Sequence, residues 1–280
     1  MQTLAGDCPV VVVPVSFIRS ASPRTVSSTR KRLFKLGHGK STRWTLAALL
    51  LLVASSRCGA ACVDPEKTAH VTVNITRYFN EIEEKSRPDL LGIQGTGWFA
   101  SSGLMVTASH VAEAMHLSTT DWKDIELRDS ESKRSVGVRV LRLVGNQSEK
   151  IAVLELKTPL PDVQFLRFRM EPLAANESVI SLAFLDDRLR IAEGRFVEYG
   201  GHEKFTEAAM LELSNGNDRL VLDHGASGAP VLDCQGRVVA VVSHILTQTI
   251  RMVPSMRVST PWGRANVVSI PIQTLTAAVE

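Results

Sequence analysis

One serine of the chain lies in a turn whose composition suits nucleophilic chemistry. Ser227 stands in the stretch HGASGAPVLD, close to Gly225, Gly228 and Pro230. A serine hydroxyl becomes a nucleophile when a base removes its proton and nearby donors stabilise the oxyanion that forms. Gly225 can turn its N–H group inward because it has no Cβ atom. The turn predicts an oxyanion hole made by the N–H groups of Gly225 and Ser227. A glycine-rich turn without chemistry is the alternative.

His110 is the candidate general base for this serine. It follows a predicted strand in VTASHVAEAM and opens a short predicted helix. A single histidine is more often structural than catalytic. His110 stands out because GTGWF precedes it and GASGAPV follows much later in the chain.

The elements that must position these residues are short strands separated by turn signals. Residues 69–75 and 95–111 are typical of strands, and similar runs recur up to the last stretch, ANVVSIPIQTLTAAV. That stretch predicts a strand followed by a short terminal helix. Short strands at this spacing favour an all-β barrel or sandwich over a helical bundle.

The N-terminal part of the chain is typical of a targeting segment. Residues 1–43 are basic, and the apolar run WTLAALLLLVA follows, with the small residues SSRCGAAC after it. Residues 44–61 therefore predict a signal peptide and export to the periplasm or the medium. A retained membrane anchor is the second interpretation of this segment. Residues 1–43 are interpreted as a long or mis-assigned start, and no structure is predicted there.

The charge distribution separates this leader from the body. Residues 1–45 hold eight Lys and Arg residues and one acid, whereas the chain from Val63 onward holds 23 basic and 28 acidic residues. A mildly acidic body without a basic stripe argues against a nucleic-acid partner. The four cysteines have no zinc-ligand spacing and form no recognisable disulfide framework, so neither a metal nor another cofactor is predicted.

These stretches together resemble the trypsin-like (chymotrypsin-fold) serine proteases, closest to bacterial trypsin-like peptidases and the HtrA protease domain. The similar stretches lie in family order within residues 66–280, and they are Gly95–Val111, Ile151–Leu156, Gly225–Ser243 and VVSIPIQTL. The resemblance implies two six-stranded antiparallel β-barrels with the active site in the cleft between them. It also implies that His110 is the base, Ser227 the nucleophile and Gly225 an oxyanion donor. No PDZ-like domain follows.

The resemblance further implies a substrate pocket lined by Val221, Ser243, His244 and Ile245. Val221 stands where an acid would select Lys or Arg, and Ile245 stands where a glycine would leave a deep pocket open. We expect a shallow apolar pocket for small aliphatic side chains. A second possibility is that His244 binds an acidic substrate residue.

The chain departs from the family at the third catalytic residue. Lys150 stands where an aspartate is expected before IAVL. That acid normally stabilises the cationic form of the base, and a lysine would destabilise it. Glu149 is the nearest acid, but a regular strand would point it to the other face, so a bulge would be needed. Asp121 or Asp124 could supply the acid from a separate loop, or the site has no acid at all.

Two functions are compatible with the sequence. The first is a secreted or periplasmic serine endopeptidase that acts on proteins or peptides through Ser227 and His110. The second is a protease-fold protein, weak or inactive as a catalyst, that binds peptides or a partner. Lys150 is the argument for the second, and the presence of Ser227, His110 and Gly225 together is the argument for the first. The sequence does not indicate the oligomeric state.

Overall fold

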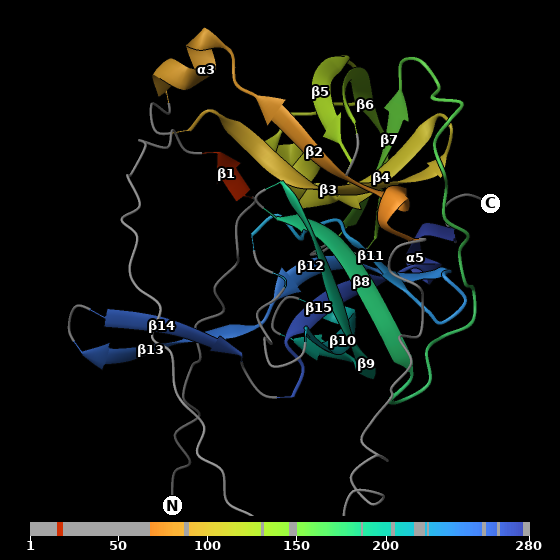
Figure 1. The fold of residues 1–280 in the computed structure, drawn as a ribbon, viewed down its shortest axis with the longest axis vertical. Helices are drawn as coiled ribbons and strands as arrows, with labels where there is room; N and C mark the ends of the chain where they lie inside the picture. The colour runs from red at the N-terminus through yellow and green to blue at the C-terminus, as the bar shows by residue number, and fades with distance from the viewer. Residues whose placement is uncertain are drawn as a thin grey trace, which may run out of the picture. The chain divides into compact units, whose positions relative to one another are not determined.

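The computed structural model describes residues 16–18, 68–86, 90–129, 132–145, 150–185, 187–202, 205–215, 222, 224–253, 256–261 and 264–276. Two antiparallel sheets each close on themselves (Figure 1). The prediction of an all-β protein with two six-stranded barrels is confirmed, and the predicted terminal helix is α5 (Gln273–Thr276). The leader assigned to residues 1–43 and 44–61 lies outside the described residues, apart from the short strand β1 (Ser16–Ile18).

The first barrel contains the strand that leads to His110. Its strands close in the order β3-β2-β5-β6-β7-β4, with β4 pairing back to β3, and β1 adds to the start of β3. These strands are β2 (Thr72–Tyr78), β3 (Gly92–Ser101), β4 (Leu104–Ala108), β5 (Lys123–Arg128), β6 (Lys133–Gly145) and β7 (Lys150–Leu156). Two short helices, α3 (Glu81–Ser86) and α4 (Ser109–Ala114), interrupt the strands. The strand predicted from residue 69 begins at Thr72, because Ala69–Val71 form a 3-10 turn.

The second barrel contains the turn with Ser227. Its strands close in the order β10-β15-β12-β11-β8-β9. They are β8 (Ser178–Leu185), β9 (Arg188–His202), β10 (Phe205–Ser214), β11 (Pro230–Leu232), β12 (Val238–Ile245) and β15 (Val267–Pro271). A separate two-stranded hairpin, β13 (Thr247–Val253) and β14 (Met256–Pro261), follows β12 (Figure 1). This hairpin was not among the elements expected from the sequence.

Besides the core inside each barrel, an apolar cluster lies between the two barrels and contains residues of both. Trp98 of the first barrel is fully buried and packs edge-on against Phe168. The cluster also contains Val106 and Ile151 from the first barrel and Ile180 from the second. Burial of this much apolar surface between the barrels fixes their relative position, because the surface would otherwise be exposed to water.

A polar contact reinforces this junction at the turn between β8 and β9. Asp187 accepts hydrogen bonds from Asn74 (3.1 Å) and Gln94 (3.3 Å), and its other oxygen lies 2.6 Å from Arg128. Asp187 belongs to the second barrel, and its three partners lie on β2, β3 and β5 of the first. The barrels are therefore held by both apolar burial and a charge-assisted hydrogen-bond cluster.

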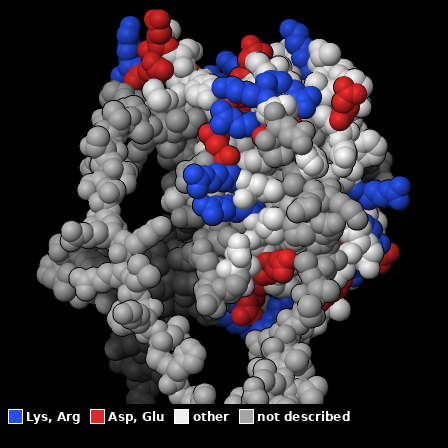
Figure 2. All heavy atoms as spheres, in the orientation of Figure 1, with Lys and Arg blue, Asp and Glu red and all other residues white. Residues whose placement is uncertain are grey.

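Charged side chains of both signs are interspersed on the face drawn in Figure 2. Several charged residues of the protein form ion pairs, including Lys133 with Glu126 and Arg139 with Glu155, each at 2.7 Å. Among the residues that the structure describes, no helix is long and apolar enough to cross a membrane. Cys234 is disulfide-bonded, which the cysteine spacing did not indicate.

Candidate active site

The start of helix α4 positions His110. Strand β4 ends at Ala108, and His110 is the second residue of the helix that follows. Val111, Ala112 and Met115 bury the inner face of this helix in the core of the first barrel. The imidazole is therefore carried by a packed element, and its orientation does not depend on an exposed loop.

The turn around Ser227 is held by left-handed glycines and by strand β12. Gly225 has φ of 100° and Gly228 has φ of 92°, which is backbone geometry that other residues rarely adopt. Gly228 donates its N–H to the carbonyl of Val242 at 2.8 Å, and Val242 donates its own N–H to Ala229 at 2.8 Å. Within the described part of the chain, the N–H groups of Gly225 and Ser227 donate to no other atom. Both donors are thus available to an incoming oxyanion.

Gly228 also allows the two barrels to approach each other closely. A Cβ atom at this position would lie 2.2 Å from the carbonyl oxygen of Thr96 and 2.3 Å from the hydroxyl of Thr107. Both threonines belong to the first barrel. The second glycine of GASG is therefore required by contact between the barrels as well as by its φ angle.

Ser227 is buried, and its hydroxyl is engaged in this structure. Its Oγ donates to the backbone carbonyl of Ser243 on β12, at 3.2 Å. The Nε2 atom of His110 is buried and has no hydrogen-bond partner among the described residues. Ser227 and His110 are therefore not hydrogen-bonded to each other in this structure.

His244 of the second barrel lies against His110 of the first. The two ring centroids are 5.2 Å apart with the planes tilted by 46°. The hydroxyl of Ser243 and Nδ1 of His244 are 2.7 Å apart, within hydrogen-bond distance. Burial lowers the pKa of His110 from 6.5 to about 4, and the charge that His244 carries when protonated contributes to the same shift. His110 is therefore neutral near pH 7, and its cationic form is destabilised.

No carboxylate of the described residues contacts His110. Glu149, the nearest candidate in the sequence, lies outside the described ranges. Asp121 accepts hydrogen bonds from the hydroxyls of Ser118 (3.3 Å) and Thr120 (3.1 Å) in its own loop. Asp124 is exposed on β5 and makes no contact with His110, so neither aspartate acts as its partner in this structure.

Lys150 begins strand β7 and is partly buried. Its side chain has no hydrogen bond or ion pair to another described residue, and its charge is not among the causes of the low pKa of His110. The hypothesis that Lys150 suppresses the base by pointing at it therefore receives no support from the geometry.

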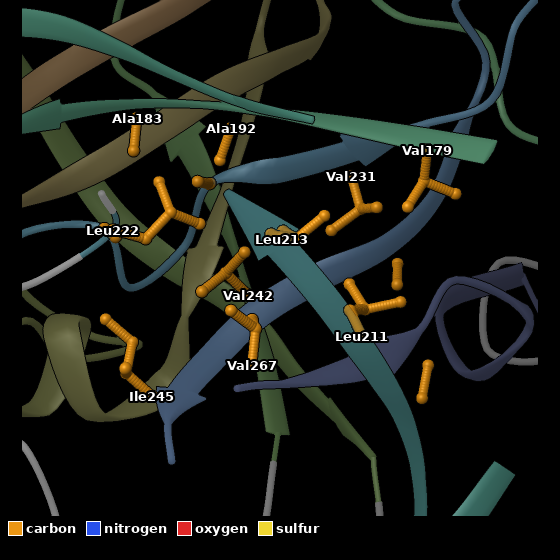
Figure 3. Close-up of a cluster of buried hydrophobic side chains, with 14 of the residues drawn as sticks. Val179, Ala183, Ala192, Leu211, Leu213, Leu222, Val231, Val242, Ile245 and Val267 are labelled. Carbon is orange, nitrogen blue, oxygen red and sulfur yellow. The ribbon is translucent and has the colours of Figure 1, made fainter. Parts of the chain in front are cut away.

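The residues predicted to line the substrate pocket are largely buried. Ser243 is fully buried, and His244 is 6% exposed because it faces His110. Ile245 is also 6% exposed and packs in the core of the second barrel with Leu222 (Figure 3). Val221 lies outside the described residues. The side chains of Ile245 and Leu222 therefore belong to the packed core of the second barrel.

Metal binding finds no geometric support here. In the part of the chain that the structure describes, no group of three or more His, Cys, Asp and Glu residues is placed to hold a metal ion.

Thr96 is a neighbour of the site that was not predicted from the sequence. It lies on β3 between two glycines, and its N–H donates to the carbonyl of Ser227 at 3.1 Å. The only signal in the sequence is the GTG triplet, which does not reveal a contact with a residue 131 positions later.

Two closed antiparallel barrels of this order define a chymotrypsin-like fold. Residues 95–241, more than half of the chain, match the model of the trypsin-like peptidase domain. The chain belongs to this family, as the sequence predicted. No curated protein sequence matches the chain at a significant level.

Several solved structures share the fold at low sequence identity. The active form of the Rv3671c protease from M. tuberculosis is 15% identical with a TM-score of 0.51, and the match covers 88% of this chain and 92% of that chain. Deg5 is 17% identical with a TM-score of 0.50 and coverages of 76% and 88%. The HtrA-type protease AlgW with a tripeptide is 12% identical with a TM-score of 0.52 and coverages of 77% and 60%. At these identities the likeness shows the fold alone.

Proposed function

We propose that this member of the trypsin-like peptidase family is a serine endopeptidase with Ser227 as nucleophile and His110 as general base. The observation that carries the proposal is the buried Nε2 atom of His110, which has no hydrogen-bond partner in the described part of the chain. Buried polar atoms are normally paired, so an unpaired imidazole nitrogen is available to accept a proton. The turn around Ser227 also supports the proposal, because the N–H groups of Gly225 and Ser227 donate to no atom of the described residues.

The reaction has two halves. The Oγ atom of Ser227 bonds to the carbonyl carbon of the peptide while its proton passes to Nε2 of His110. The carbonyl oxygen becomes an oxyanion that the N–H groups of Gly225 and Ser227 stabilise. The C–N bond then breaks, the proton moves from His110 to the leaving amine, and an acyl ester remains. Water hydrolyses the ester by the same steps, with His110 accepting a proton from the water.

The geometry supports a slow enzyme. No described carboxylate stabilises the imidazolium of His110, and its low pKa opposes proton uptake from Ser227. When the triad aspartate of a serine protease is changed to an amide, turnover falls by about 10⁴-fold. We therefore expect turnover well below that of a serine protease with a complete triad.

A mixture of unstructured peptides tests the proposal. Wild-type protein should generate new peptide termini that mass spectrometry detects after long incubation, and Ser227→Ala should generate none. Equal cleavage by both proteins would show a contaminating protease, and no cleavage by either would remove the enzymatic proposal.

The second candidate function is peptide binding without turnover. One observation favours it, which is that the hydroxyl of Ser227 bonds the Ser243 carbonyl and makes no hydrogen bond to a described imidazole. If the protein only binds peptides, Ser227→Ala should bind them as tightly as wild type, and neither protein should form an acyl adduct.

We also propose that the substrate residue before the cleaved bond is small. Ile245 and Leu222 are buried in the core next to β12 and leave little room for a large side chain. Peptides with Ala or Val at this position should be cleaved in preference to peptides with Phe, Lys or Glu. Preference for Glu would favour the hypothesis that His244 binds an acidic residue.

Export of the protein is also part of the proposal. The apolar segment over residues 44–54, with the basic stretch before it and the small residues after it, supports export. N-terminal sequencing of the exported protein should give a start near residue 62. A product that keeps residues 44–54 would indicate a membrane anchor.

A further inference from the structure

Thr96 connects the first barrel to the nucleophile turn through several hydrogen bonds. It is fully buried on β3. Its Oγ1 donates to the carbonyl of Gly225 at 2.7 Å and accepts the N–H of Phe184 at 3.1 Å. Its backbone N–H donates to the carbonyl of Ser227 at 3.1 Å. One residue of the first barrel therefore holds two carbonyls of the turn in the second barrel.

The carbonyls of Gly225 and Ser227 lie on either side of the peptide that carries the Ser227 N–H group, one of the two proposed oxyanion donors. The Gly225 carbonyl belongs to the peptide that precedes Ala226, and the Ser227 carbonyl belongs to the peptide that precedes Gly228. Only Ala226 and Ser227 lie between the two anchors. The direction of the Ser227 N–H group, one of the two oxyanion donors, is thus constrained from both sides. Gly225 and Gly228 need such anchors, because glycine backbone is otherwise the most conformationally free.

Thr96 is itself held by the strand that carries the base. The hydroxyl of Thr107 on β4 donates to the carbonyl of Thr96 at 2.8 Å. Thr107 lies three residues before His110, and β4 leads directly into the helix that carries it. A continuous path of covalent and hydrogen bonds therefore runs from the general base through Thr107 and Thr96 to the nucleophile turn.

We infer that Thr96 is a positioning residue that holds the Ser227 turn in the oxyanion-binding conformation and in register with His110, an inference that rests on the proposed function. Its hydroxyl acts through the Gly225 carbonyl. Thr107 acts indirectly, because its hydroxyl donates a hydrogen bond to the Thr96 carbonyl.

The test compares substitutions that differ by a single hydroxyl. Thr96→Val keeps the shape of the side chain and removes the hydroxyl, whereas Thr96→Ser keeps the hydroxyl. Thr72→Val is the matched control, because Thr72 is a fully buried threonine of the neighbouring strand β2 whose hydroxyl has no hydrogen-bond partner in the described part of the chain. Thr107→Val removes the hydrogen bond from Thr107 to the Thr96 carbonyl, which lies further from the turn. This variant replaces Thr96→Val in the comparison if Thr96→Val does not fold.

We expect Thr96→Val to lower kcat by about 10- to 100-fold with little change in KM, since misplaced oxyanion donors act on the transition state. Thr96→Ser should restore most of kcat, Thr107→Val should lower kcat less, and Thr72→Val should leave it unchanged. Amide hydrogen exchange should become faster in residues 225–229 of Thr96→Val and at Phe184, whose N–H loses its acceptor, and should stay at the wild-type rate elsewhere in the core of each barrel.

The exchange measurement separates this inference from the proposed function. If wild type neither cleaves peptides nor reacts with an active-site probe, the proposed function fails, and exchange in residues 225–229 still decides the role of Thr96. Unchanged exchange there in Thr96→Val would overturn the inference, as would unchanged kcat. A Thr96→Ser protein as impaired as Thr96→Val would also overturn it, because the effect would then belong to the methyl group.

Discussion

The imidazole of His110, carried by the first barrel, lies against the imidazole of His244, carried by the second, with ring centroids 5.2 Å apart. The proposed general base His110 therefore contacts a second imidazole, and no carboxylate of the described residues contacts it. Burial disfavours the imidazolium of His110, and so does the positive charge that His244 carries when it is protonated, so both destabilise the charge that His110 must carry during the reaction.

We predict that the reaction of Ser227 with a phosphonylating probe loses its rate only below about pH 4, because the pKa of His110 is lowered to about 4. His244→Phe removes the smaller of the two causes and keeps an aromatic ring in contact with His110. The acid limb of the pH–rate profile should then move to higher pH but stay below 6.5, since burial remains. A wild-type limb near pH 6.5 would contradict this prediction.

The same shift predicts a pH dependence of stability. Unfolded His110 binds a proton below about pH 6.5, whereas folded His110 binds one only near pH 4. Between these values the unfolded state holds more protons, so the free energy of unfolding falls as the pH falls. We expect His110 to account for a loss of about 3 kcal/mol between pH 7 and pH 4. Denaturant unfolding of wild type and His110→Gln measures it, and equal losses in both proteins would contradict it.

The close approach of the barrels at Gly228 predicts a large effect of one methyl group. Gly228→Ala would place its Cβ atom 2.2 Å from the Thr96 carbonyl, and the barrels would have to separate. We expect a loss of several kcal/mol in the free energy of unfolding, or no folded protein, from the clash and the positive φ together. Gly236→Ala is the control, with φ of 73° and nothing within 4 Å of the added atom, and should cost about 1 kcal/mol. Similar losses from both would contradict the close contact at Gly228.

The sequence predicted the fold and the family because their signals are local. Each signal depends on a few adjacent residues: the short alternating strands, the histidine after β4 and the glycine-rich turn before β11. The order of these signals along the chain then indicates the family. Ile245 was expected to restrict the pocket, and the structure places it in a packed core. The catalytic roles of Ser227, His110 and Gly225 stay predictions.

The rest of the site depends on contacts between distant segments. Thr96 and Gly225 are 129 residues apart, and so no local pattern indicates their hydrogen bond. The pairing of His244 with His110 likewise follows only from the packing of one barrel on the other. Asp121 or Asp124 was one alternative for the acid, but Asp121 bonds to its own loop and Asp124 lies on a strand.

Lys150 and Glu149 give a further prediction about the third catalytic residue. Lys150→Ala should leave the reaction of Ser227 unchanged, because the Lys150 side chain has no partner among the described residues. Lys150→Asp should raise the rate only if the side chain at this position reaches His110, because it then places a carboxylate beside the base. Glu149→Gln should have little effect. A rate abolished by Glu149→Gln would show instead that Glu149 has moved into the role of the acid.

The most direct measurement is intact-mass analysis after exposure to a fluorophosphonate, which phosphonylates activated serines. We predict one slow adduct on wild type, none on Ser227→Ala and at most a trace on His110→Gln, with the modified peptide containing Ser227. No adduct on folded wild type at high probe concentration would contradict the assignment of Ser227 as nucleophile, and so would an equal adduct on Ser227→Ala.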